Sequence, residues 1–277
     1  MNKLLWIIQD GFYNDANHMN FIDALKRMES DYIIVSFTLN PETLDFVESN
    51  LNWDTNDLKN IERPVCFIGG YSLARMAKKY GWNPGTFANE NFNYQAWIKG
   101  YGKENLLNSE LQITTIKDAP SSFSFNSFFA RPVEDTKAFT GRPFTVEEFS
   151  EFKRKILSKE LAYQTLHPDT EIMISPLVNI YSETRFFVVD KQIVAHSFYK
   201  RGGQPFFSDN IEPFIKDYAI KMLERWQPSG VFVIDIADTE YGLKIVELNG
   251  FNSAGIYESN PYRIIDSVEN FVMHDIF

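Results

Sequence analysis

Two apolar runs in the C-terminal half decide the fold: VFVIDIA at residues 231–237 and LKIVELN at residues 243–249. Side chains alternate between the two faces of a strand, so Glu247 and Asn249 share a face, about 7 Å apart. The polar residues between the runs favour a turn, which makes the two runs a hairpin. In such a hairpin Asp235 can point to the same side as the other two.

Three oxygen-bearing side chains on one face of an apolar hairpin require an explanation. A buried ionised carboxylate is costly unless it is paired or bound to a metal. Mg²⁺ prefers hard oxygen ligands and usually takes one or two carboxylates together with substrate phosphates. The pattern therefore predicts a magnesium site on Asp235, Glu247 and Asn249. The structural alternative is that Asp235 faces solvent and Glu247 pairs with a nearby Lys or Arg, since surface ion pairs are common.

The remaining patterns predict an α+β fold. Upstream of the hairpin, the expected elements are a helix opened by the capping-box spacing of Thr145 and Glu148, an apolar strand, a second hairpin and a helix. Their ranges are 145–157, 172–175, 185–199 and 213–226. The first part of the chain alternates strands and helices, which is typical of a small α/β domain with a mainly parallel sheet. Its predicted strands are 4–8, 32–37 and 65–68, and its helices are 17–28 and 71–80.

The predicted division is a domain of residues 1–119 and a second domain of residues 120–277. Residues 81–122 are rich in Asn, Gly and aromatic side chains and give no clear element. The sequence Pro120-Ser121-Ser122 has the composition of a boundary. A further strand is expected from 123 to 131.

Composition excludes several classes of function. The formal net charge is −10, which disfavours bulk nucleic-acid binding because an acidic surface repels phosphates. A single cysteine, Cys66, excludes an internal disulfide or a cysteine-based zinc site. The apolar run at residues 4–8 is too short for a signal peptide or a membrane span. A cytoplasmic protein with no membrane partner is expected.

In this context the sequence resembles the ATP-grasp superfamily, in which an Asp on one strand and Glu-x-Asn on the next bind the Mg²⁺ ions that bridge the ATP phosphates. Asp235, Glu247 and Asn249 match that motif in order. The segments FFARP (128–132), IMISPL (172–177) and ETRFFVV (183–189) are similar to the strands that bind nucleotide. The resemblance implies antiparallel-sheet subdomains that clasp ATP, preceded by the small α/β domain.

The closer likeness is to a divergent clade that contains a eukaryotic cell-division-cycle protein, an assembly factor for a translation initiation factor. Residues 135–141 (DTKAFTG) and the Glu-x-Arg strand suggest this clade. The N-terminal half, with FIGG (67–70) and YGWNPG (80–85), looks like uncharacterised bacterial and phage members, which implies such a source.

The resemblance implies roles for further residues. Arg131 would contact the nucleotide phosphates, where many ATP-grasp enzymes have Lys; Arg keeps the charge but differs in geometry. Adenine would lie on Ile174, Ser175, Pro176 and Leu177. Glu183 and Arg185 would bind the nucleotide, and Arg185 and Lys137 would stabilise charge during catalysis. The structural alternatives are a solvated loop lysine for Lys137 and an internal salt bridge, for instance with Glu183, for Arg185.

The implied function is an ATP- and Mg²⁺-dependent carboxylate–amine ligase that acts through an acylphosphate, with an amino acid, a peptide or a protein as the acceptor. Two alternatives remain open: an ATP-binding assembly or chaperone-type protein without ligase turnover, and a plain α+β domain whose acids are structural. Residues 252–257, which follow the Glu-x-Asn strand directly, are expected to line the acceptor site together with the turn Ile68-Gly69-Gly70.

Overall fold

The computed structural model describes residues 3–12, 15–40, 46–47, 55–120, 126–133, 139–160 and 166–276. The chain forms two compact units. Unit 1 contains residues 1–89, 182–236 and 247–277, and unit 2 contains residues 90–181 and 237–246. Each unit is described by itself below.

Unit 1 begins with a parallel sheet in the strand order β2-β1-β5-β6. Its strands are β1 (Leu5–Gln9), β2 (Asp31–Val35), β5 (Val65–Ile68) and β6 (Pro84–Gly85). The connecting helices are α1 (Asp15–Arg27), α2 (Thr55–Lys59) and α3 (Tyr71–Tyr80), and a short antiparallel pair is formed by β3 (Thr38–Leu39) and β4 (Phe46–Val47). The predicted parallel sheet is confirmed, and α3 ends where expected because Gly81 adopts the left-handed conformation, with φ 69°.

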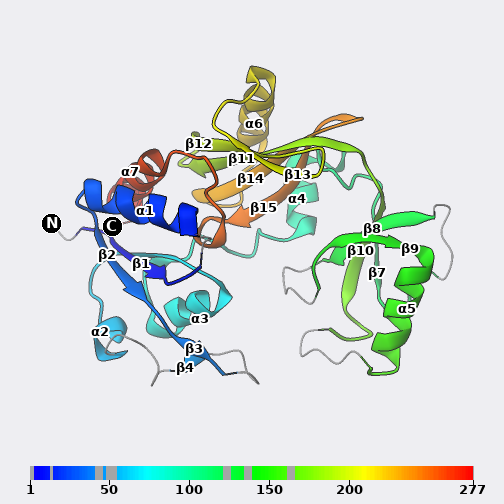
Figure 1. The fold of residues 1–277 in the computed structure, drawn as a ribbon, viewed down its shortest axis with the longest axis horizontal. Helices are drawn as coiled ribbons and strands as arrows, with labels where there is room; N and C mark the ends of the chain where they lie inside the picture. Colours follow the sequence, from blue (N-terminus) through cyan, green and yellow to red (C-terminus); the bar gives the residue numbers. More distant parts are fainter. Residues whose placement is uncertain are drawn as a thin grey trace. The chain divides into compact units, whose positions relative to one another are not determined.

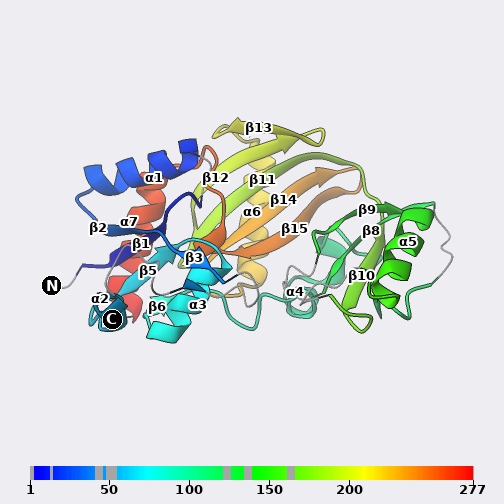
Figure 2. The same ribbon diagram turned by 60° about the horizontal axis from the view of Figure 1, so that its bottom comes forward.

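A five-stranded sheet with the order β13-β12-β11-β14-β15 carries the decisive hairpin. The strands are β11 (Ile180–Val189), β12 (Gln192–Arg201), β13 (Gln204–Ser208), β14 (Val231–Thr239) and β15 (Gly242–Gly250), seen side by side in Figure 2. Both predicted hairpins are confirmed. Helix α6 (Pro213–Arg225) covers one face of this sheet, and α7 (Pro261–Phe271), continued by a π-helical turn (Val272–Ile276), lies on the other (Figure 1).

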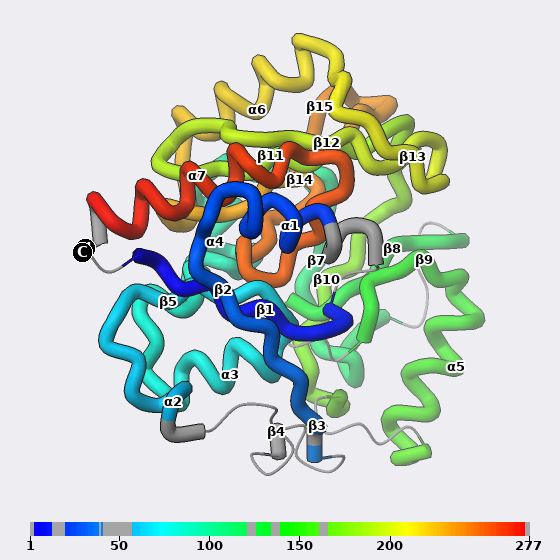
Figure 3. The backbone as a smooth tube through the Cα atoms, turned by 60° about the vertical axis from the view of Figure 1, so that its left-hand side comes forward, coloured from blue at the N-terminus to red at the C-terminus, as the bar shows by residue number. Residues whose placement is uncertain are grey.

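The core of unit 1 joins its two sheets. Trp6 of β1, Phe187 of β11 and Val233 of β14 belong to one buried cluster with Phe21 of α1 and Ile264 of α7. Helices α1 and α7 lie side by side (Figure 3). The alternation of β14 therefore sends Val231, Val233 and Asp235 toward this core, while the intervening residues face α6.

Unit 2 is built on an antiparallel sheet with the order β7-β10-β8-β9. Its elements are α4 (Tyr94–Tyr101), a 3₁₀ turn (Lys103–Asn105), β7 (Gln112–Thr115), β8 (Ser127–Pro132), β9 (Arg142–Thr145), α5 (Val146–Leu157) and β10 (Glu171–Pro176). The capping box of α5 is present as predicted, with Thr145 and Glu148 each accepting the other's backbone N–H. Phe128, Phe144 and Phe149 pack together beneath α5, which accounts for part of the high aromatic content.

The two units do not coincide with the predicted domains, because β11, β14 and β15 each contribute residues to both units. The division at residues 119 and 120 stays a prediction about domain organisation. Residues 121–125, part of the strand predicted for 123–131, lie outside the described residues. Among the helices that the structure describes, none is both long enough and apolar enough to cross a membrane.

Candidate functional site

The acid trio lies together in unit 1. Asp235 projects from β14, and Glu247 and Asn249 project from β15. The amide nitrogen of Asn249 lies 2.9 Å from Glu247 Oε1 and 3.5 Å from Asp235 Oδ2. Asp235 has 0% exposure, whereas the Glu247 side chain is 37% exposed. The structure thus brings the three predicted metal ligands together at a point where one buried acid meets a partly open one.

Arg185 of β11 occupies the centre of this group. Its Nε donates to Asp235 Oδ1 at 2.9 Å, and its Nη2 donates to Asp235 Oδ2 at 2.8 Å. Nη1 donates to the Gly255 carbonyl at 3.1 Å, and Nη2 lies 3.9 Å from Glu247 Oε1. The internal salt bridge considered for Arg185 is therefore present, but its partner is Asp235 rather than Glu183.

Burial and charge oppose each other in this pair. Burial raises the pKa of Asp235 to about 6, against the opposing effect of Arg185 and with a further rise from Glu247 and Glu183. Burial by itself would lower the pKa of Arg185, but the charge of Asp235 and the two hydrogen bonds raise it above its ordinary value. A fork-like pair of this kind is the geometry in which Arg best compensates a buried carboxylate.

Glu183, two residues before Arg185 on the same face of β11, has its own partners. It accepts a hydrogen bond of 2.6 Å from the Tyr199 hydroxyl and pairs with Lys200 Nζ at 2.8 Å. Burial, followed by the charges of Asp235 and Glu183, raises the pKa of Tyr199, so the hydroxyl stays a donor. Glu183 is held in place by β12 and does not contact the Arg185 guanidinium through any described hydrogen bond.

The donor set suits a hard cation. Asp235 and Glu247 supply carboxylate oxygens, and the amide oxygen of Asn249 is available if its side chain turns by half a revolution, an orientation that hydrogen bonding decides. Among the described residues, no three His, Cys, Asp or Glu side chains converge as metal ligands, so the third oxygen has to come from this amide. Arg185 now provides the positive charge that a bound cation would provide in its place.

The loop that follows β15 is fixed to the parallel sheet of unit 1. The buried Asn252 donates to the carbonyl oxygens of Phe67 and Gly85 at 2.8 and 3.0 Å and accepts from the Phe87 N–H at 3.1 Å. Ser253 Oγ donates to the Gly69 carbonyl at 2.8 Å. The structure therefore brings the predicted loop to the predicted turn, and the acceptor role of both remains a prediction.

The predicted nucleotide residues of unit 2 lie on β8 and β10. Arg131 stands across from Met173 in the register, and its guanidinium carbon lies 5.7 Å from the centre of the Trp97 ring. Ser175 is buried and donates to Asn108 Oδ1 at 2.8 Å. Ile174 packs into the core beneath α5, so its side chain is not free to touch a nucleotide.

Two further predicted residues have different surroundings. Pro176 ends β10, and Leu177 follows it as an exposed residue. Lys137, the predicted lid lysine, falls in residues 134–138, outside the described part of the chain. Its role stays a prediction.

The sequence did not reveal the role of Tyr199. Glu183 stands across from Lys200 and Thr184 across from Phe198, so Tyr199 is the extra residue of a β-bulge. The bulge turns its hydroxyl toward Glu183, and no residue type in the segment signals it.

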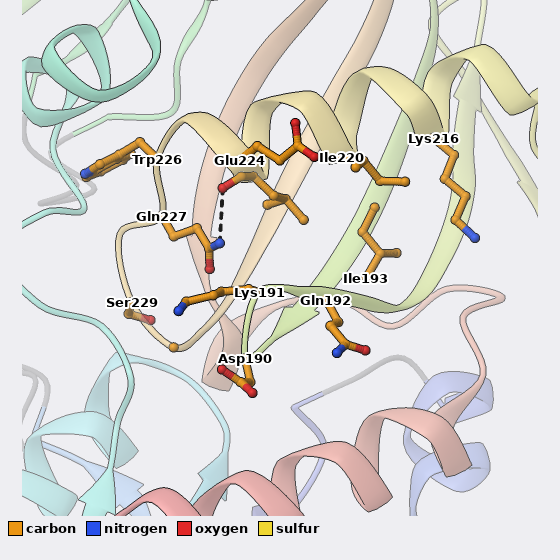
Figure 4. A pocket seen from close by; sticks show the side chains of 12 residues that line it. Asp190, Lys191, Gln192, Ile193, Lys216, Ile220, Glu224, Trp226, Gln227 and Ser229 are labelled. Atoms are coloured by element: carbon orange, nitrogen blue, oxygen red, sulfur yellow. Dashed lines mark hydrogen bonds between the residues drawn. The ribbon is translucent and has the colours of Figure 1, made fainter.

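A pocket of about 830 Å³ lies elsewhere in unit 1, between α6 and the β11–β12 turn. Figure 4 shows Lys191 and Ile193 on one side and Ile220 and Glu224 on the other. None of the predicted site residues lines it, so this pocket is not the site built above.

Comparison with known proteins gives the class. Residues 63–268 match a family described as an ATP-grasp domain, the third family of its clade. The chain belongs to this family, and the predicted ATP-grasp fold of the divergent clade is confirmed. A comparison with curated proteins gave no significant match.

Solved structures show the same fold. A D-alanine–D-alanine ligase from Bacillus anthracis, complexed with ATP, matches with a TM-score of 0.60 and 13% identity over 98% of each chain. The ATP-grasp ligase PsnB, complexed with a minimal precursor, matches with a TM-score of 0.56 and 12% identity over 97% of this chain and 98% of that one. The D-cycloserine synthetase DcsG matches with a TM-score of 0.55 and 10% identity, over 96% and 99%.

Proposed function

We propose that this protein is an ATP- and Mg²⁺-dependent carboxylate–amine ligase. The observation that carries the proposal is the convergence of Asp235, Glu247 and Asn249 around Arg185, at hydrogen-bonding distances, within a family of ATP-grasp domains. Two of the structural relatives are ligases by name, and the D-alanine–D-alanine ligase was solved with ATP bound. The residues fit Mg²⁺, since both carboxylates and the amide can present oxygen to one point.

In the proposed reaction an oxygen of the substrate carboxylate bonds to the γ-phosphorus of ATP, and ADP leaves. The nitrogen of the amine then bonds to the acyl carbon of the acylphosphate, phosphate leaves, and the nitrogen loses a proton. Mg²⁺ bound to Asp235, Glu247 and Asn249 would neutralise phosphate oxygens. Arg185 would exchange part of its pairing with Asp235 for the phosphoryl group, where its fork of donors stabilises charge.

In unit 2 we assign Arg131 to the phosphates of the nucleotide. Its guanidinium carries a fixed positive charge and can bind phosphate through two hydrogen bonds. Because the Ile174 side chain is in the core, the adenine contacts assigned to β10 would use its backbone together with Ser175, Pro176 and Leu177. The Lys137 lid role belongs to the same proposal.

The sharpest variant is Glu247→Gln. Asp235→Asn is a poorer test, because it would leave the Arg185 guanidinium buried without a charged partner and destabilise the fold. Glu247 is partly exposed and has no such obligation. We expect Glu247→Gln to stay folded and to lower substrate-dependent ADP release at least 100-fold. ADP release would be measured with Mg²⁺–ATP and mixtures of carboxylates and amines.

The matched control is Glu224→Gln, which removes the same charge from the exposed surface of α6, on the other face of the sheet. It should leave ADP release unchanged. ATP binding without any turnover in the wild type would favour the assembly-protein alternative. Normal turnover in Glu247→Gln would show that the acids are structural.

A further inference from the structure

Three aromatic rings form a continuous stack beside Arg185 in unit 1. The Tyr199 and Tyr257 rings are nearly parallel, with centroids 4.9 Å apart, and the Phe207 ring lies 5.4 Å from that of Tyr257 at an interplanar angle of 14°. The Arg185 guanidinium carbon lies 5.1 Å from the Tyr257 centroid and 5.4 Å from that of Tyr199. The stack therefore connects the acid trio to β13, the edge strand of the sheet.

Tyr257 is held in an uncommon backbone conformation. Its φ is +53°, in the left-handed region that non-glycine residues seldom adopt. The same loop is tied to the parallel sheet by Asn252 and Ser253, and to Arg185 through the Gly255 carbonyl. Such strain persists only where the surroundings impose it, and it gathers at binding sites.

The outer end of the stack is open to solvent. Phe206 and Phe207 are exposed by 42% and 49%, a nearly equal amount. Phe206 is covered differently, since it packs against Phe198 at 5.4 Å and has the Arg201 guanidinium 4.5 Å from its ring. Among the described residues, Tyr257 is the ring partner of Phe207. Phe207 thus presents an aromatic surface at the end of a rigid stack.

The charges around the stack are unequal. The carboxylates are those of Glu183, Asp235, Glu247 and the exposed Glu258, which follows Tyr257 directly; the cations are Arg185 and Lys200, each paired with one of these acids. The partly exposed Glu247 and the exposed Glu258 leave a negative excess beside the rings. This charge is complementary to an ammonium group.

We infer that the Tyr199–Tyr257–Phe207 stack recognises the amine substrate, and that this amine carries an aromatic side chain that stacks on Phe207. The inference rests on the proposed ligase function for the reaction in which the amine takes part, but it makes a separate statement about binding. The ring of the substrate extends the stack outward, and its ammonium group is drawn to the carboxylates.

The test compares two probes of similar shape, L-phenylalaninamide and L-cyclohexylalaninamide, of which only the first has an aromatic face. Dissociation constants would be measured by titration calorimetry with the full chain, with and without Mg²⁺–ADP. We expect the wild type to bind the phenyl probe about five-fold more tightly, as aromatic stacking predicts. Phe207→Leu should reduce the ratio to near one, whereas the matched Phe206→Leu should keep it.

The outcomes separate this inference from the proposed function. Absence of binding, absence of a preference for the phenyl probe, or an unchanged ratio in Phe207→Leu would overturn the inference. Mg²⁺–ATP affinity, measured for the same proteins, should be equal in all three. If the wild type fails to bind Mg²⁺–ATP but shows the aromatic preference and its loss in Phe207→Leu, the proposed reaction is wrong while the recognition stands.

Discussion

At the scale of single residues, the pairing of Arg185 with Asp235 matters most, because it makes a buried acid tolerable without a cation. Both charges are almost fully buried, and three hydrogen bonds hold the guanidinium. The pair therefore has a structural part and, by our proposal, a chemical part. A double-mutant comparison can separate the two.

We expect Arg185→Met to destabilise the fold by about 3–5 kcal/mol, since it leaves Asp235 charged and unpaired. Adding Asp235→Leu should recover much of that loss, because an apolar pair can replace a buried ion pair. Urea denaturation of the wild type, both single variants and the double variant would measure this. ADP release should be absent from the double variant even where its stability returns; recovered turnover would mean that the pair has no chemical part.

At the scale of elements, the sequence predicted what alternation and capping determine. The two hairpins and α3 follow from local patterns, and so does the start of α5 at Thr145. Alternation also placed Asp235, Glu247 and Asn249 on one face. Residues 81–122 gave no element because α4 has Gly and aromatic residues among its eight positions, and β6 pairs for only two residues. The partner of Arg185 was missed since neighbours across strands depend on register, which sequence alone left open.

The capping box of α5 gives a prediction for one element. Thr145 Oγ1 accepts the Glu148 N–H at 3.1 Å, and Glu148 Oε2 accepts the Thr145 N–H at 2.9 Å. Thr145→Ala should lower the stability of unit 2 by about 1 kcal/mol. The control is Ser150→Ala on the same helix, whose hydroxyl only donates back to the Val146 carbonyl and should cost little. Hydrogen exchange of the β8 and β10 amides would report the change. Equal effects of both substitutions would show that the cap contributes nothing.

At the scale of the whole molecule, the proposed ligands should appear as stability. The chain has a formal charge of −10, so ATP alone meets a repulsive surface and Mg²⁺ alone meets an acid trio already compensated by Arg185. We therefore expect each to stabilise the protein weakly and the two together to stabilise it strongly. A ligand that binds only the native state, present at 100 times its dissociation constant, adds about 2.7 kcal/mol to the free energy of unfolding.

Thermal melts with Mg²⁺, ATP, both, and both plus a chelator would measure this linkage. Glu247→Gln should melt like the wild type without ligands and lose most of the combined shift, while Glu224→Gln should keep it. The comparison is informative because neither variant removes a buried partner, so the unliganded melts serve as an internal check on folding. A combined shift no larger than the sum of the separate ones would contradict a joint Mg²⁺–ATP site on the β14–β15 hairpin. A full shift in Glu247→Gln would place the nucleotide and its metal away from that residue.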